Sequence, residues 1–133
     1  MTRIIYNMQP MLRARDLRET IDFYTNVLGF TVDGTFPEDA PTWCSMHSGN
    51  ARMMWTSLPD GVEAPSFNGR IYMYPDDVEA VWGRLKTTTD VVEPLFLTDY
   101  DMREFTIRDP NGYELSFGNS AGEHEHDEHG NHI

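Results

Sequence analysis

The chain has 133 residues, of which 39% are hydrophobic and 12% aromatic, enough for one folded domain with a packed core. Ten Lys and Arg residues stand against 22 Asp and Glu residues, which gives a formal net charge of −12 at pH 7. Such an acidic protein repels nucleic acid, so no nucleic-acid partner is expected. The charge either attracts cationic small molecules or serves solubility alone.

The sequence predicts no signal peptide and no membrane span. No apolar run approaches the roughly 20 residues needed to cross a bilayer. The N-terminal "MTRIIYNMQPML" lacks the long apolar region and small-residue cleavage site of a secretory signal. The single cysteine, Cys44, excludes an internal disulfide and an all-cysteine zinc site, and it is expected to be a small buried strand residue. We therefore expect a soluble, cytoplasmic protein.

The first half of the chain is typical of a strand, a helix and three further strands. Asp16 is a suitable N-cap for the helix, and Glu19 completes a capping box. The helix has one apolar face, and Gly29 is placed to end it; the apolar residues at helical spacing are Leu17, Ile21, Tyr24 and Leu28. The three following strands are expected at residues 30–36, 42–49 and 51–58.

The second half repeats this order after a polar linker rich in Pro and Gly, residues 59–69. A strand, "RIYMY" (residues 70–74), precedes a helix capped by Asp76 or Asp77. The apolar face of this helix consists of Val78, Val81, Trp82 and Leu85, and strands are expected at residues 91–98, 103–109 and 112–117. The similar pieces "RDLRETIDFYTNVLG" and "DDVEAVWGRLKTTT" indicate a duplication with a period of roughly sixty residues.

The C-terminal residues 119–133 contain few apolar side chains and are expected to be disordered. Histidines alternate with acids in this tail, which makes it a weak candidate for a surface zinc or nickel chelator. The alternative is a solvated tail with incidental metal affinity. The four histidines are His124, His126, His129 and His132.

Two motifs carry a resemblance to a known superfamily: "MLRARDLRETIDFYTNVLGF" early in the chain and "REFTIRDPNGYELSFG" late in it. Together they resemble the vicinal oxygen chelate superfamily, which includes glyoxalases, extradiol dioxygenases and bleomycin-resistance proteins. The resemblance implies an α+β fold in which two βαβββ modules form a cupped, incomplete barrel around a small-molecule pocket, usually in a homodimer. Residues 1–118 would then be a single domain, with modules at residues 3–58 and 70–118.

The same resemblance implies where a metal would be bound. Metal-dependent members use His, Glu or Gln on the first and last strands of each module. Gln9 falls at the first such position, Arg70 falls where His is expected, and Ser116 falls where Glu is expected. The fourth position lies in residues 52–57, which offer only Met, Trp or hydroxyl groups. Arg has no lone pair to give and Ser is a poor ligand, while His47, the only histidine of the folded region, lacks partners. We therefore expect no metal in the fold and no cofactor.

Strand alternation predicts which side chains would line the cup instead. These are Gln9, Met11, Arg13, Arg70, Tyr72, Tyr74, Glu114 and Ser116. Such a surface suits an aromatic or amphipathic organic ligand, although the tyrosines and methionines could equally be core. Arg70 requires a partner, either Glu114 or an acidic group of a ligand. Phe105 and Ile107 share one strand face and Glu104 and Thr106 the other, but the pattern does not say which faces the cup.

The sequence thus favours a metal-free small-molecule binding protein, similar to bleomycin-resistance proteins, that sequesters an aromatic or cationic ligand and has no catalytic residues. An alternative is a metal-dependent lyase, isomerase or dioxygenase with an unconventional site that uses Gln9, Glu114 or the tail histidines. Metal-free acid–base chemistry through Glu114, Tyr72 or Tyr74 is a further form of that alternative. A third is a regulatory module that senses a metabolite. The segment 109–112, "DPNG", is explained by turn formation.

Overall fold

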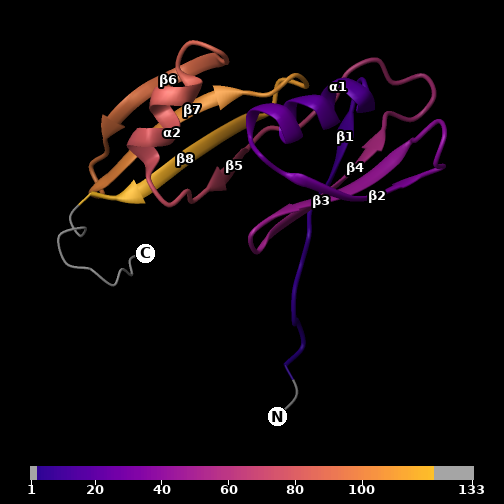
Figure 1. Cartoon of the computed structure of the whole chain (residues 1–133), viewed down its shortest axis with the longest axis horizontal. Helices are drawn as coiled ribbons and strands as arrows, with labels where there is room; N and C mark the ends of the chain where they lie inside the picture. Colours follow the sequence, from indigo (N-terminus) through magenta and orange to yellow (C-terminus); the bar gives the residue numbers. More distant parts are fainter. Residues whose placement is uncertain (1–2, 122–133) are drawn as a thin grey trace. The chain divides into compact units, whose positions relative to one another are not determined.

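The computed structural model describes residues 3–121 and consists of two compact units, Met1–Ser66 and Phe67–Ile133. Each unit has the element order strand, helix, strand, strand, strand (Figure 1). The predicted α+β fold of two βαβββ modules is therefore confirmed. The boundary between the units falls within the predicted linker, residues 59–69.

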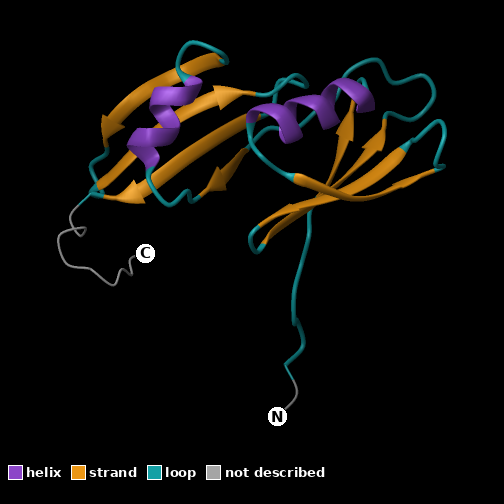
Figure 2. Cartoon of the chain, in the orientation of Figure 1, coloured by secondary structure: helices purple, strands orange, loops and turns teal. Residues whose placement is uncertain are grey.

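The elements of the two units follow the predicted order closely. The first unit contains β1 (Met11–Ala14), α1 (Leu17–Asp22), a π-helical turn η1 (Phe23–Val27), β2 (Thr31–Phe36), β3 (Trp43–Ser48) and β4 (Ala51–Ser57). The second unit contains β5 (Arg70–Met73), α2 (Val78–Leu85), β6 (Asp90–Leu97), β7 (Met102–Arg108) and β8 (Glu114–Ser120). Figure 2 shows each helix lying over a four-stranded sheet.

The two sheets have the same topology. The strand order is β1-β4-β3-β2 in the first unit and β5-β8-β7-β6 in the second. In each, the first strand pairs in parallel with the last, and the remaining neighbours are antiparallel. Both sheets are open, because their two outer strands do not pair with each other. The duplication seen in the sequence is therefore a duplication of topology.

Each helix begins at the aspartate cap that the sequence predicts. The carboxylate of Asp16 accepts a hydrogen bond from the Glu19 N–H at 3.1 Å. Asp77, rather than Asp76, caps α2 and accepts from the N–H groups of Glu79 and Ala80 at 3.1 and 3.3 Å. These bonds satisfy backbone donors that would otherwise lack partners in the first turn. Gly29 follows the first helix with φ +80°, the left-handed conformation that its predicted role requires.

The core of the second unit lies between α2 and one face of its sheet. Phe105, Ile107 and Leu115 have no exposed surface, and Phe105 stacks on Phe117 with ring centroids 4.9 Å apart. Trp82 of α2 contacts Phe105 at a centroid distance of 5.1 Å. The face that carries Phe105 and Ile107 is therefore the core face. Glu104 and Thr106 lie on the other face of the sheet, which settles the question that alternation left open.

Strand β8 continues to Ser120, so the predicted start of the disordered tail at residue 119 is wrong by at least two residues. The side chain of Asn119 provides the physical reason. Its Oδ1 accepts the Val78 N–H at 2.7 Å, and its Nδ2 donates to the Pro75 carbonyl at 2.7 Å. These bonds hold the end of β8 against the start of α2. The tail histidines lie outside the described residues.

The turn between β7 and β8 forms as predicted. The Gly112 N–H donates to the Asp109 carbonyl at 3.0 Å, and Gly112 has φ +90°. The Asp109 carboxylate accepts from the N–H groups of Asn111 and Tyr113 at 2.8 and 2.9 Å. Within the described part of the chain, no helix is long and apolar enough to cross a membrane.

Candidate functional site

The face of the second sheet opposite the core is polar and aromatic, and we call it the open face. The register pairs Arg70 with Glu114 and Tyr72 with Ser116 on neighbouring strands β5 and β8. Alternation therefore brings four of the predicted site residues onto one face, as expected. The ladder between β7 and β8 adds Glu104, Thr106 and Arg108 to the same face.

Arg70 finds its partner in Glu114, one of the two partners that the sequence offers. The Arg70 Nε donates to the Glu114 Oε1 at 3.1 Å, and this bond is the main reason why the pKa of Arg70 is raised. Glu114 also approaches Arg108, with 3.9 Å between the Glu114 Oε2 and the Arg108 Nη2. Since all three side chains are substantially exposed, these ion pairs each contribute at most about 1 kcal/mol.

Ser116 does not present a free ligand for a metal. It is fully buried, and its hydroxyl lies 2.7 Å from the hydroxyl of Thr106. Arg70, at the other matched position of this unit, is paired with Glu114 and carries no lone pair. The donor set at these positions therefore does not fit the metal that the resemblance associates with them. Among residues 3–121, no three or more His, Cys, Asp and Glu side chains are grouped in a way that could hold a metal ion.

Glu104 is the most unusual residue of the open face, because its carboxylate is almost completely buried, with 3% of its surface exposed. The hydroxyl of Tyr100 donates to both of its oxygens, at 3.1 and 3.0 Å, and the Tyr72 hydroxyl lies 3.4 Å from Oε1. No Lys, Arg or His side chain of the described residues forms an ion pair with it. Glu104 is thus a buried carboxylate that is hydrogen-bonded but has no cationic partner.

Two local features of the chain position this carboxylate and its tyrosines. The loop between β6 and β7 carries Tyr100 and is closed by hydrogen bonds between Thr98 and Met102, with Asp101 in a left-handed conformation at φ 65°. Across the ladder from Glu104 stands Gly118. A Cβ atom at Gly118 would lie 3.0 Å from the Glu104 Cγ, so glycine leaves the room that the carboxylate occupies.

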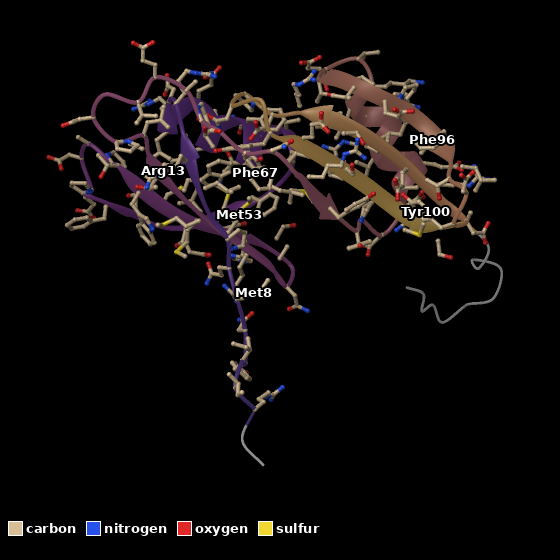
Figure 3. The ribbon with its side chains drawn as sticks, turned by 180° about the vertical axis from the view of Figure 1, so that it is seen from behind. Met8, Arg13, Met53, Phe67, Phe96 and Tyr100 are labelled. Atoms are coloured by element: carbon tan, nitrogen blue, oxygen red, sulfur yellow. The ribbon has the colours of Figure 1, made fainter. Side chains whose placement is uncertain are left out.

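Further aromatic side chains lie on the strands and loop next to Glu104. Tyr72 and Tyr74 stack with their centroids 6.4 Å apart, and Phe96 is the ladder partner of Glu104 on β6. Figure 3 shows Phe96 and Tyr100 at the same end of the second sheet. All four rings are at least 40% exposed, so they are accessible to a ligand. The tyrosine–glutamate site is defined here as Tyr72, Tyr74, Phe96, Tyr100 and Glu104.

Hydrogen bonding shifts the ionisation of one member of this site. The pKa of Tyr100 is raised above its ordinary value, first by the hydrogen bond with Tyr72 and then by the bond to Glu104. Phenol groups that donate to a carboxylate resist losing their protons. Tyr100 therefore stays a neutral hydrogen-bond donor beyond the physiological pH range.

Sequence reasoning identified Tyr72 and Tyr74 but missed Phe96, Tyr100 and Glu104. Glu104 was recognised as a face partner of Thr106, and only the register against Ser116 was needed to place both on the open face. Phe96 is placed by two irregularities in the pairing of β6 with β7, which simple alternation does not anticipate. Tyr100 lies in a loop, where periodicity gives no signal.

The predicted site residues of the first unit lie on or beside β1. Met11 and Arg13 are both exposed and share a face of that strand, while Gln9 is exposed and precedes it by two residues. His47, which was considered only as a metal ligand, has a neighbour that the sequence did not predict, since its Nδ1 lies 2.7 Å from the Asp33 Oδ1. A bulge in β2 between Val32 and Gly34 places Asp33 outside the regular register, which the sequence pattern did not reveal.

The comparisons with known proteins agree with this architecture. A family model described as "Glyoxalase/Bleomycin resistance protein/Dioxygenase superfamily" matches residues 8–117. No curated protein sequence matches the chain.

Several solved structures have the same fold. TioX from Micromonospora sp. ML1 is 20% identical, with a TM-score of 0.70 over 85% of this chain and 98% of that chain. TnmS3, an antibiotic binding protein from Streptomyces sp. CB03234, is 21% identical, with a TM-score of 0.68 over 87% of this chain and 97% of that one. A glyoxalase/bleomycin resistance protein/dioxygenase from Nocardioides is 16% identical, with a TM-score of 0.72 over 99% and 93% of the respective chains. The two βαβββ modules and the family match together show that this chain belongs to the glyoxalase/bleomycin resistance protein/dioxygenase superfamily.

Proposed function

We propose that this chain is a metal-free small-molecule binding protein, similar to bleomycin-resistance proteins, that sequesters an aromatic organic cation at the tyrosine–glutamate site. The observation that carries the proposal is Glu104, a carboxylate with 3% of its surface exposed that receives tyrosine hydroxyls and no cationic side chain from the described residues. A cationic ligand would supply the missing charge.

The energetics of a buried charge support this reading. A carboxylate removed from water loses several kcal/mol of solvation unless it is paired, and hydroxyl donors compensate for only part of that loss. A ligand cation held beside Glu104 would be attracted to its carboxylate, because opposite charges interact more strongly at a protein surface than in bulk water. A bound cation would give Glu104 the oppositely charged partner that the hydroxyl groups do not supply.

The aromatic side chains support the same class of ligand. The faces of tyrosine and phenylalanine rings attract cations, with gains of about 0.5–2 kcal/mol per contact. The stacked Tyr72–Tyr74 pair also offers a flat surface to an aromatic ring. The net charge of −12 adds long-range attraction for a cation. TnmS3, which has the same fold, is described as an antibiotic binding protein.

The proposal is tested by titrating benzyltrimethylammonium, an aromatic monocation, into the full chain and its variants by isothermal calorimetry. Glu104→Gln keeps an acceptor for the tyrosine hydroxyls but removes the charge, so we expect binding to weaken by about tenfold or more. Glu38→Gln makes the same charge change at an exposed position in the first unit and should leave the affinity within about twofold. Equal affinities for wild type and Glu104→Gln would contradict the proposal.

Gly118→Ala gives a second test that changes no charge. The added methyl group would press on the Glu104 side chain, as the 3.0 Å approach to its Cγ indicates. We expect this displacement to weaken binding of the same cation by about fivefold, because a charge pair depends on close approach. Thermal unfolding of the variant separates a loss of binding from a loss of folding.

A second function, metal-free acid–base catalysis, is favoured by the hydrogen bonds that join Tyr72, Tyr100 and Glu104. Positioned carboxyl and phenol groups are able to transfer protons to and from a bound substrate. Mass spectrometry of a ligand recovered after prolonged incubation distinguishes the two functions. An unchanged ligand supports sequestration, and a converted one supports catalysis.

A further inference from the structure

A second feature of the open face is a hollow of about 400 Å³ at the start of β5 and beside the turn between β7 and β8. Every residue that lines it belongs to the second unit, and Phe67 at its rim is labelled in Figure 3. Its volume lies within the range of about 300–1,000 Å³ that is usual for small-molecule sites. The lining residues are Phe67, Asn68, Gly69, Arg70, Arg108, Gly112 and Glu114.

The hollow contains two guanidinium groups and a single carboxylate between them. Arg70 is hydrogen-bonded to Glu114 at 3.1 Å, so one of the two positive charges is closely paired. Arg108 is held more loosely, with 3.9 Å to the Glu114 Oε2 and 3.8 Å to the Asp90 Oδ2. Both distances exceed those of hydrogen bonds, so the guanidinium of Arg108 retains donors for an incoming acceptor.

The chemistry of these groups selects a carboxylate as the incoming acceptor. A guanidinium presents N–H donors in a planar fork that matches the two oxygens of a carboxylate. Within the hollow, Arg70 already binds the Glu114 carboxylate through one hydrogen bond from its Nε. The guanidinium group of Arg108 therefore has donors that suit the carboxylate of a ligand.

The hollow and the tyrosine–glutamate site lie on one face of one sheet at a defined separation. Glu104 and Arg108 are both on β7, four residues apart, and their ladder partners on β8 are Gly118 and Glu114. A strand rises about 3.3 Å per residue, so the backbone positions of the two residues are about 13 Å apart along the strand. Tyr72 lies between them, because it pairs with Ser116 in the middle of this stretch.

We propose that the two sites bind the opposite ends of one ligand, an elongated zwitterion with an aromatic cation at one end and a carboxylate at the other. The cationic end rests on the function proposed above, whereas the carboxylate end rests on Arg108 and the hollow. The ring of Tyr72 provides the aromatic surface between them. The ligand class then narrows from organic cations to elongated molecules that carry a positive charge at one end and a carboxylate at the other.

The carboxylate end is tested with benzoate alone, titrated into the full chain and followed by calorimetry or by NMR. Arg108→Gln should weaken benzoate binding by about fivefold or more, because it removes the donor fork. Glu114→Gln should strengthen benzoate binding by about threefold, because it removes the competing carboxylate. Arg103→Gln is the matched control, since Arg103 is equally exposed on β7 but pairs with Glu79 outside the hollow. Absence of saturable benzoate binding, or equal affinities for wild type and Arg108→Gln, would overturn the inference.

The link between the two ends is tested with a biphenyl that carries a trimethylammonium-methyl group at one end and a carboxylate at the other. We expect it to bind at least about tenfold more tightly than benzyltrimethylammonium, because the second contact is intramolecular once the first has formed. Glu104→Gln and Arg108→Gln should each abolish this gain. A gain that persists in Arg108→Gln would overturn the inference while leaving cation binding intact. If the wild-type protein bound benzoate but did not bind benzyltrimethylammonium, the proposed function would be refuted instead.

Discussion

At the scale of single residues, the open face holds an acidic side chain that is almost completely buried. Glu104 is as buried as the apolar core residues, yet among residues 3–121 its side-chain partners are only the hydroxyls of Tyr72 and Tyr100. Buried charges without partners are rare in proteins because they cost free energy of folding. A buried acidic side chain that is hydrogen-bonded only to tyrosines among the described residues is therefore a candidate ligand-binding group.

Tyr100 provides a measurable signature of this arrangement. Because its pKa is raised in the folded protein, Tyr100 adds stability that is complete below the ordinary tyrosine pKa of about 10 and is lost as the pH rises above it. Tyr100→Phe should therefore reduce the fall in stability on the alkaline side, as measured by urea unfolding at a series of pH values. Tyr6→Phe, at an exposed tyrosine in the first unit, is the control and should leave the pH dependence unchanged.

Cys44 gives a second prediction at this scale. Burial raises the pKa of its thiol to about 11, so the reactive thiolate is scarce at neutral pH. We expect a thiol-specific reagent to modify the native protein at least about tenfold more slowly than the urea-unfolded protein. Equal rates in the two states would show that Cys44 is accessible. That result would contradict its burial on β3 in the core of the first unit.

At the scale of elements, the end of β8 and the start of α2 stabilise each other. Asn119→Ala would leave the Val78 N–H and the Pro75 carbonyl without their side-chain partner. We expect a loss of about 1–2 kcal/mol in the free energy of unfolding, measured by chemical denaturation.

Asn119→Asp is the informative companion variant. It keeps the oxygen that accepts from Val78 but replaces the amide that donates to Pro75, so about half of the loss should be recovered. If both variants were as stable as wild type, the side-chain bonds of Asn119 would not contribute to the stability of the fold. The account of β8 would then be contradicted.

The elements themselves were predictable because local signals determine them. Asp16, Asp77 and Gly29 mark helix ends by chemistry that acts within a few residues, and strand alternation fixed the shared face of Arg70, Tyr72, Glu114 and Ser116. The candidate site was only half predictable, because it depends on long-range register. Bulges in β2 and β6 shift Asp33 and Phe96 away from their simple positions, and a bulge of one residue leaves little trace in composition.

At the scale of the whole molecule, the duplicated modules have the same topology but have diverged in chemistry. The second sheet carries buried Glu104, two arginines and three tyrosines on or beside its open face, whereas the first carries Met11, Arg13 and the His47–Asp33 pair. The superfamily fold is shared by enzymes and binding proteins alike, so function has to be argued from these side chains. A homodimer and a cytoplasmic location stay predictions.

The central claim is that an aromatic cation binds at the tyrosine–glutamate site, and amide chemical-shift mapping by NMR tests it most directly. Benzyltrimethylammonium would be titrated into the isotope-labelled full chain, and the shift of every backbone amide followed. We expect the largest amide chemical-shift changes in residues 98–106 and on β5 around Tyr72. These changes should vanish in Glu104→Gln. Changes that centre on the first unit, or none at saturating ligand, would contradict the claim.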